Sequence, residues 1–341
     1  MSITIKDIAK RAGVSPSTVS RVCNNNPAIS KETRERVQKI IEELGYELPT
    51  IQEDLAIPPI RNIGIVLPPS DRETYENSFY LKAIRGISQV CNQQQTASTI
   101  ITGQDYPELL HSVKTLHLSG RIDGFILLYS RKNDVIADYL CELAIPYVIV
   151  GKPQDPSGAT LCIDNDNLTA GRDAADYLYN LGHRRIGFLG KGKNHIYAAD
   201  RQAGWQLSLM LNGLMPRSED CIEMEHVYSD DTPLRQLLRR EDRPTAFVVS
   251  DDLLGLVLER ACAATGLSIP EDISVAGYDG IRVGRHIEPQ LTTLRQDTKL
   301  IGVRAGECLV ELIEKPKTTL VQQVVVGGSV YKGKTVGSVK G

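Results

Sequence analysis

Apolar residues near the N-terminus recur with helical spacing. Ile5, Ile8, Ala9 and Ala12 stand at positions i, i+3, i+4 and i+7, which predicts a helix with one apolar face, and Gly13 predicts its end. Two further helical stretches follow residues 15 and 30. Two short helices joined by a glycine-containing turn and braced by a third form a helix-turn-helix unit, which we predict for residues 1–46.

The next two helices also have marked ends. Ser15-Pro16 provides a hydroxyl N-cap followed by proline at the first helical position, and Gly45 predicts the end of the third helix. The residues that face the core of these two helices are Val19, Val22, Val37, Ile40, Ile41 and Leu44.

Four residues of the second predicted helix remain on its outer surface, namely Pro16, Ser17, Thr18 and Arg21. In a helix-turn-helix unit the N-terminal part of this helix enters the major groove of DNA. Arg21 can pair with guanine or a phosphate, and Ser17 and Thr18 offer short hydroxyl contacts. The alternative is a generic three-helix bundle whose charges are merely solvated.

Beyond residue 61, short apolar runs alternate with helical segments, and the second half of the chain repeats the first. The apolar runs of the first half are 62–67, 124–128 and 146–150, and they correspond in order to runs 185–189, 246–249 and 273–277 of the second half. Each run predicts a buried parallel strand, and helices over 80–94 and 200–212 follow the first strand of each half. We therefore predict two doubly wound parallel sheets that face each other across a cleft, with chain crossovers near 160–164 and 289–293.

The charge distribution separates the two parts. The net charge is −3, but residues 1–41 hold eight Lys or Arg against three Asp or Glu, which leaves −8 for the remainder. A basic head on an acidic body is typical of a small DNA-binding module attached to another domain. Pro49, Pro58 and Pro59 mark residues 47–61 as a linker.

Several classes of function find no support in the sequence. The seven cysteines form no C-x-x-C pair and the six histidines no i,i+4 pair, so we expect reduced thiols, no metal and no cofactor. Neither a phosphate-loop pattern nor a nucleophile elbow is present, so we do not expect an enzyme. No apolar run approaches the roughly 20 residues that span a bilayer. The N-terminus also lacks a secretory pattern, so we expect a cytoplasmic protein without membrane contact.

The head resembles the lactose-repressor (LacI/GalR) family. The matching residues are Thr4-Ile5-Lys6-Asp7-Ile8-Ala9, Ala12-Gly13-Val14-Ser15, Thr18-Val19-Ser20-Arg21-Val22 with Asn24, and Leu44-Gly45-Tyr46. The resemblance implies an all-α, lambda-repressor-like head in a homodimer on a palindromic double-stranded DNA operator. It implies that the DNA contacts come from Thr4, Ser15, Pro16, Ser17, Thr18, Ser20, Arg21, Asn24 and Tyr46.

The linker departs from the family pattern. Leu55 stands where the family inserts a leucine into the minor groove. However, Gln52-Glu53 replaces the usual Ala-Arg, and Glu53 and Asp54 would be repelled by phosphate. An exposed acidic linker that contributes little affinity is the alternative to a leucine wedge.

The body resembles the family's effector domain, which has the fold of periplasmic sugar-binding proteins. The resemblance implies an effector and dimerisation domain over 62–330, with a tail at 331–341. Its first subdomain would comprise 62–162 plus 292–322, and its second 163–291 plus 323–330.

The resemblance also implies the ligand-binding residues. Arg201 and Asp279 match the family's effector-binding arginine and aspartate, a pair that suits vicinal hydroxyls, although an inter-loop salt bridge is the alternative. Phe79 and Tyr80 would stack on a sugar ring or pack at the hinge. Comparable loop positions hold Lys152, Tyr197, Tyr228 and Ser250.

Within the family, the chain resembles the regulators of maltose operons in low-GC bacteria, on residues 76–80, 125–130, 133–134, 150–153 and 163–167. The resemblance implies a repressor with maltose or a short maltodextrin as inducer. The alternatives are a global carbon regulator that responds to a phosphorylated carrier protein, a non-regulatory sugar-binding protein, and an enzyme on a doubly wound fold.

Overall fold

The chain forms two compact units, Met1–Pro59 and Ile60–Gly341. The computed structural model describes residues 5–23, 29–44, 61–69, 77–153, 160–192, 194–281, 288–316 and 322–339. Among these residues, no helix combines the length and the apolar character that crossing a membrane requires.

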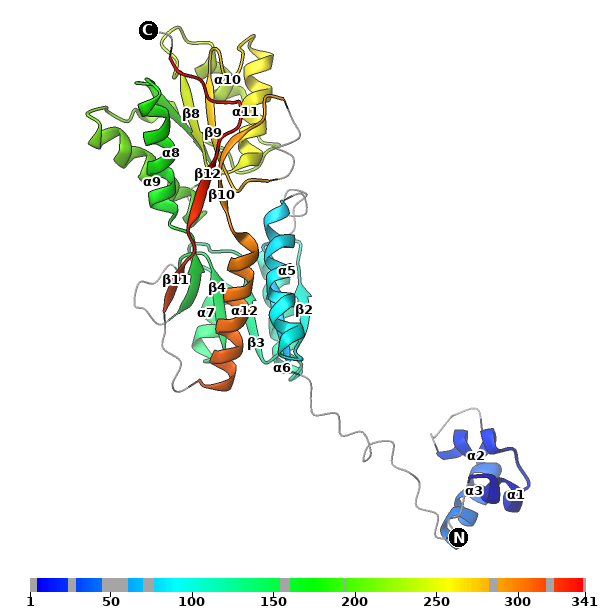
Figure 1. Ribbon diagram of the computed structural model, residues 1–341. Coiled ribbons are helices and arrows are strands. Elements are labelled where there is room, and N and C mark those ends of the chain that lie inside the picture. The colour runs from blue at the N-terminus through cyan, green and yellow to red at the C-terminus, as the bar shows by residue number, and fades with distance from the viewer. Residues whose placement is uncertain are drawn as a thin grey trace. The chain divides into compact units, whose positions relative to one another are not determined.

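The first unit is the predicted three-helix arrangement (Figure 1). It consists of α1 (Ile5–Ala12), α2 (Pro16–Cys23) and α3 (Lys31–Leu44). Gly13 adopts a φ of +67°, which favours glycine after a helix end. The Ser15 Oγ accepts a hydrogen bond from the Thr18 amide at 3.2 Å and so caps α2. The buried core consists of Ile8, Ala9, Ala12, Val19, Val22 and Val37.

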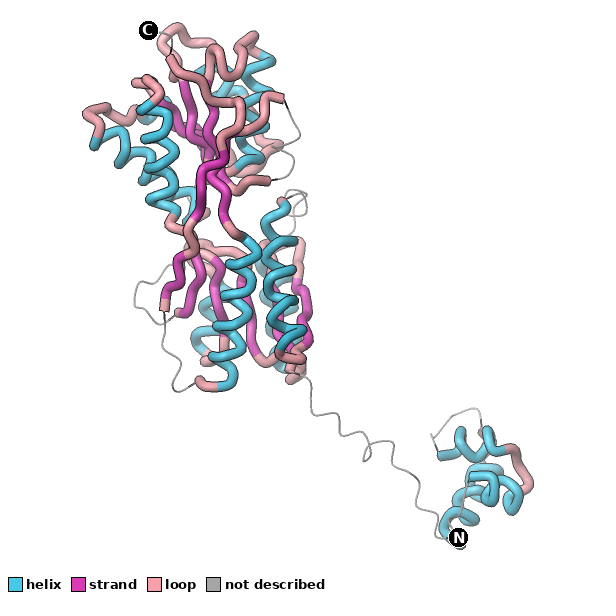
Figure 2. The backbone as a smooth tube through the Cα atoms, viewed as in Figure 1, coloured by secondary structure: helices cyan, strands magenta, loops and turns pink. Residues whose placement is uncertain are grey.

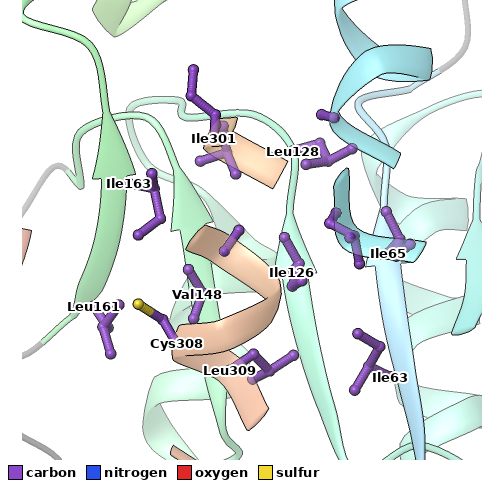
Figure 3. Packing of buried hydrophobic residues seen from close by; sticks show 14 of the residues in the cluster. Ile63, Ile65, Ile126, Leu128, Val148, Leu161, Ile163, Ile301, Cys308 and Leu309 are labelled. Carbon is purple, nitrogen blue, oxygen red and sulfur yellow. The ribbon is translucent and has the colours of Figure 1, made fainter. Parts of the chain in front are cut away.

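The second unit begins with a six-stranded parallel sheet in the order β11-β5-β4-β3-β1-β2 (Figure 2). The strands are β1 (Asn62–Val66), β2 (Ala97–Ile101), β3 (Gly124–Leu127), β4 (Tyr147–Val150), β5 (Leu161–Asp164) and β11 (Gln323–Val325). Helices α5 (Ser78–Gln93) and α12 (Thr298–Glu314) pack on one face, where Ile301 and Leu309 of α12 belong to the same buried cluster as Ile126 of β3 (Figure 3). Helices α6 (Tyr106–Leu118) and α7 (Val135–Glu142) cover the other face.

A second sheet repeats this plan in the order β12-β10-β9-β8-β6-β7. Its strands are β6 (Ile186–Gly190), β7 (Cys221–Glu223), β8 (Ala246–Val249), β9 (Ser274–Tyr278), β10 (Thr292–Gln296) and β12 (Gly328–Tyr331). Only β12 runs antiparallel to its neighbour. One face carries α8 (Asn167–Asn180) and α9 (Ile196–Leu211), and the other carries α10 (Thr232–Leu238) and α11 (Asp252–Ala264). The predicted internal repeat is therefore confirmed strand by strand.

The predicted subdomain boundaries are corrected at each crossover. The prediction places residues 292–296 in the first subdomain, but they form β10, which pairs with β9 in the second sheet. It places residues 323–325 in the second subdomain, but they form β11, which pairs with β5 in the first sheet. Residues 163–164 complete β5. The crossovers are displaced because each strand continues until its backbone pairing with the neighbouring strand ends.

The predicted tail at 331–341 is also corrected, because its described part belongs to the second subdomain. Tyr331 ends β12. Thr335 is fully buried, and its Oγ1 donates to the Val275 carbonyl at 2.7 Å. The Val275 amide donates to the Thr335 carbonyl at 2.8 Å, so this segment extends the hydrogen bonding of β9.

Glycines allow one helix pair in each subdomain to pack at close range. A β-carbon at Gly302 of α12 would overlap the carbonyl oxygen of Ala83 in α5. In the second subdomain, a β-carbon at Gly204 of α9 would overlap the carbonyl oxygen of Leu168 in α8. Since both obstacles are backbone atoms, neither can move aside as a flexible side chain would.

Replacement of Gly302 by alanine is expected to lower the free energy of unfolding by about 1–3 kcal/mol, because the added methyl group forces α5 and α12 apart. Urea denaturation followed by circular dichroism measures this effect. Gly327 is the matched control, since a β-carbon there meets no atom within 4 Å. Equal stability of Gly302→Ala and Gly327→Ala would contradict the close packing.

Candidate functional site

A cavity of about 400 Å³ lies between the two sheets of the second unit. Its lining residues lie at or beyond the carboxyl ends of strands in both sheets, among them Asp164 at the end of β5, Arg131 after β3, Asp251 after β8 and Asp279 after β9. This is where doubly wound sheets bind ligands, and the volume lies in the range of small-molecule sites.

Arg201 is held in one orientation at the base of this cavity. Helix α9 begins at Ile196 rather than at residue 200, so Arg201 lies in its second turn, where the residue is buried. The Arg201 Nε donates to the Asn167 Oδ1 at 2.9 Å, and an Nη donates to the Ser250 carbonyl. The guanidinium carbon lies 3.3 Å from the centre of the Tyr278 ring. These contacts on several sides fix a buried positive charge.

Asp279 lies beside Arg201 and shares its burial. The Arg201 Nη1 and the Asp279 Oδ1 are 3.9 Å apart, and Gln296 Nε2 donates to the same oxygen at 2.7 Å. Burial, with a smaller contribution from the Asp251 carboxylate, raises the pKa of the Asp279 carboxyl to about 7, against the opposing charge of Arg201. Asp279 has a φ of 105°, an unusual backbone conformation that aims its side chain at the cavity edge.

Polar side chains from the first sheet complete this end of the cavity. Burial raises the pKa of the Asp164 carboxyl to about 6, and Asn167 Nδ2 donates to its Oδ1 at 3.0 Å. The neighbouring Asn165 donates through Nδ2 to Gln296, whereas its buried Oδ1 makes no hydrogen bond within the described residues.

The structure brings six of the eight predicted ligand-binding residues to the cavity wall: Phe79, Tyr80, Lys152, Tyr197, Arg201 and Asp279. Ser250 is fully buried behind the wall, where its carbonyl orients Arg201. Tyr228 is 57% exposed and lies outside the lining, which differs from the prediction. In its loop it is Glu225 and His226 that face the cavity.

Other lining residues were not predicted, and they share one property: each lies at or after the carboxyl end of a strand. They include Gln104, Tyr106, Arg131, Lys191, His195, Glu225 and Gln296. Gln104 and Tyr106 follow β2, and Glu225 follows β7, two strands that the apolar pattern did not indicate. Ligands of doubly wound sheets bind at the carboxyl ends of the strands, so these residues can be predicted only when every strand has been located.

Several contacts between described residues join the two subdomains at the cavity. Lys152 Nζ lies 3.2 Å from Asp200 Oδ2, and Asn165 donates to Gln296. The backbones of Arg131 and His195 form an isolated antiparallel bridge. The structure therefore has the two sheets closed over the cavity.

The charges around the cavity are balanced. Among its described lining residues, four are Lys or Arg and four are Asp or Glu. Such a wall favours a neutral ligand with many hydrogen-bonding groups over an anion or a cation. Within the described part of the chain, no group of His, Cys, Asp and Glu is arranged to hold a metal ion.

The first unit presents the polar face that was predicted for α2. Pro16, Ser17 and Arg21 are exposed, and Thr18 is half-buried. The Ser15 Oγ lies 2.7 Å from the Ser17 Oγ and 2.9 Å from the Thr18 Oγ1, so the hydroxyls form one cluster at the start of the helix. Thr4, Asn24, Tyr46, Leu55 and the side chain of Ser20 lie outside the described residues.

The raised pKa of Asp279 predicts a dependence of stability on pH. The Asp279 carboxyl has a pKa of about 7 in the folded protein and near 3.8 in the unfolded chain. Protonated Asp279 therefore favours the folded state at low pH, and this stabilisation is lost as the pH rises from about 4 to about 7. As the pH rises from about 5 to about 8, the free energy of unfolding of Asp279→Asn is therefore expected to fall less than that of the wild type. Chemical denaturation across this range measures it.

Asp230 offers the control for that measurement. Hydrogen bonds from Thr232 lower the pKa of its exposed carboxyl, so it titrates below the window in question. In Asp230→Asn the free energy of unfolding should depend on pH as it does in the wild type. The same dependence in Asp279→Asn would contradict the prediction.

Two family models match the chain. The lacI family of bacterial regulatory proteins matches residues 4–48, and the periplasmic binding protein-like domain matches residues 175–336. These matches confirm the predicted fold classes of both units.

Known regulators align with much of the chain. The HTH-type transcriptional regulator MalR of Streptococcus pneumoniae serotype 4 is 39% identical over 209 residues, covering 61% of this chain and 63% of that regulator, just under two thirds of its length. MalR of Staphylococcus xylosus is 32% identical over 92% of each chain.

Solved structures agree in fold. A complex of the transcriptional regulator CelR with cellobiose has a TM-score of 0.75 and 29% identity, covering 98% of this chain and 99% of that one. The lac repressor dimer bound to operator and the anti-inducer ONPF has a TM-score of 0.69 and 26% identity, covering 99% and 100%. These relatives are transcriptional regulators rather than enzymes, and the chain belongs to the lacI family of bacterial regulatory proteins.

Proposed function

We propose that this protein is a sequence-specific transcriptional repressor whose operator binding is controlled by a small neutral sugar. The observation that carries the proposal is the buried Arg201–Asp279 pair at the wall of a charge-balanced cavity, in a chain that also carries a helix-turn-helix. The guanidinium donates and the carboxylate accepts, which suits the adjacent hydroxyls of a sugar.

Maltose or a short maltodextrin is the sugar we propose as inducer. Support comes from the resemblance to maltose-operon regulators and from the identity with two MalR proteins. The CelR structure supports the wider class, because its bound ligand is the disaccharide cellobiose. Phe79, Tyr80 and Tyr197 supply aromatic surface in the cavity wall against which a sugar ring can pack.

We propose that the repressor acts as a homodimer on a palindromic operator in the cytoplasm. The dimeric lac repressor on its operator supports this arrangement. Two-fold symmetry in the protein would match two-fold symmetry in the DNA. Sugar binding would change the angle between the two sheets, and a coupling of about 1–3 kcal/mol between sugar and operator suffices for control.

Removal of the Arg21 side chain tests the DNA-binding part. Arg21→Ala is expected to weaken binding to a palindromic duplex, selected by the wild-type protein from random DNA, by about 1–3 kcal/mol, because a base or phosphate contact is lost. Fluorescence anisotropy at fixed salt measures the affinity. Arg260→Ala removes the same charge from an exposed position on α11 and serves as control. Equal affinities of the two variants would overturn the assignment of Arg21.

Replacement of Arg201 tests the sensing part. Maltose is expected to lower the wild-type affinity for the selected duplex by tenfold or more, whereas Arg201→Lys should bind the duplex and not respond, because lysine cannot make the paired guanidinium contacts. Arg172→Lys, at a half-buried position on α8 outside the cavity lining, should respond like the wild type. A wild-type protein indifferent to maltose would contradict the proposed inducer.

A further inference from the structure

The cavity extends well beyond the Arg201–Asp279 pair. In the second sheet, β9, β8, β6 and β7 are successive neighbours, and each contributes a lining residue: Asp279, Asp251, His195 and Glu225. Three strand spacings of about 4.8 Å separate the first from the last, roughly 14 Å in all. This exceeds the length of one hexose ring, so a monosaccharide held by Arg201 and Asp279 leaves the far end unoccupied.

The far end has its own set of polar and aromatic groups. The Arg131 guanidinium carbon lies 4.0 Å from the centre of the Tyr106 ring, and the Arg131 backbone bridges that of His195. The His195 Nε2 lies 3.5 Å from the Glu225 Oε1. Two residues of this set come from the first subdomain and two from the second.

An aromatic series connects the two ends. The ring of Tyr197 lies 4.9 Å from the guanidinium carbon of Arg201 and 5.8 Å from the ring of His195. Tyr197 therefore stands between the Arg201–Asp279 pair and the far end. A ligand that spans both ends would pass along this side chain.

We propose that Tyr106, Arg131, His195 and Glu225 form a subsite for a second sugar ring, which makes the cavity selective for neutral di- and oligosaccharides over monosaccharides. The assignment rests on the proposed sugar-sensing function. Arg131 and His195 can donate hydrogen bonds to ring hydroxyls, Glu225 accepts them, and Tyr106 adds an aromatic surface. The two subdomains share the subsite, so a second ring would join them directly.

The openness of the far end supports a chain-like ligand. The side chain of Glu225 is 53% exposed and that of His195 is 38% exposed, whereas those of Arg201 and Asp279 are 5% and 10% exposed. A saccharide can therefore have one ring enclosed at the buried end while its other end extends towards solvent.

Calorimetric titration of the full chain with maltose and with glucose tests the subsite. The wild type is expected to bind maltose at least tenfold more tightly than glucose. Arg131→Gln should lower the maltose affinity about tenfold and so reduce this ratio, since a charged hydrogen-bond donor to the second ring is lost. Lys132→Gln removes the same charge from the next residue, which is exposed and outside the lining, and should keep the wild-type ratio.

The outcomes separate the subsite from the function on which it rests. Equal wild-type affinities for glucose and maltose, or equal losses of both in Arg131→Gln, would overturn the subsite and leave the sugar sensor intact. If neither maltose, cellobiose nor glucose binds the wild type, both proposals are overturned. Thermal unfolding of both variants checks that each remains folded.

Discussion

The geometry of the ligand cavity depends on how one buried positive charge is satisfied. A guanidinium in a protein interior is tolerated only where partners surround it, and Arg201 has partners in α8, in the residue after β8 and in β9. Asn167 continues the network, because it accepts from Arg201 and donates to Asp164 at the end of β5 in the other sheet. The charge thus connects α8, β8 and β9 of the second sheet with β5 of the first.

The carboxyl groups near Arg201 differ from those of an ordinary ion pair in their pKa values. Burial raises the pKa values of Asp164 and Asp279 towards neutrality in spite of the adjacent guanidinium. A carboxyl in this range can offer a proton as well as accept one, so it can match a hydroxyl in either orientation. This versatility fits a polyhydroxylated ligand better than a ligand with one fixed pattern of donors and acceptors.

The sequence predicts most of the fold because apolar periodicity reports local structure directly. The stripes of α1, α2 and α3 and the repeated runs of β1, β3, β4, β6, β8 and β9 follow from it. The edge strands β2 and β7 escape notice, because β2 has only one buried residue and β7 has three residues. The crossovers and the buried Thr335 depend on pairing between distant segments, which no local pattern encodes. Two residues at the far end of the cavity, Tyr106 and Glu225, are missed because they follow those edge strands, whereas Arg131 and His195 follow β3 and β6, which the apolar runs predict.

The chain passes between the two sheets three times, after β5, after β10 and between β11 and β12 (Figure 1). These passages lie side by side: Asn165 donates to Gln296, and the Val326 amide donates to the Asp164 carbonyl at 2.8 Å. A single crossover would permit the two subdomains to rotate about any axis. Three adjacent crossovers restrict twisting, so that hinge bending, which opens and closes the cavity, is the low-energy motion. Ligands of different shape would then differ in their effect only in how far they open or close the two subdomains.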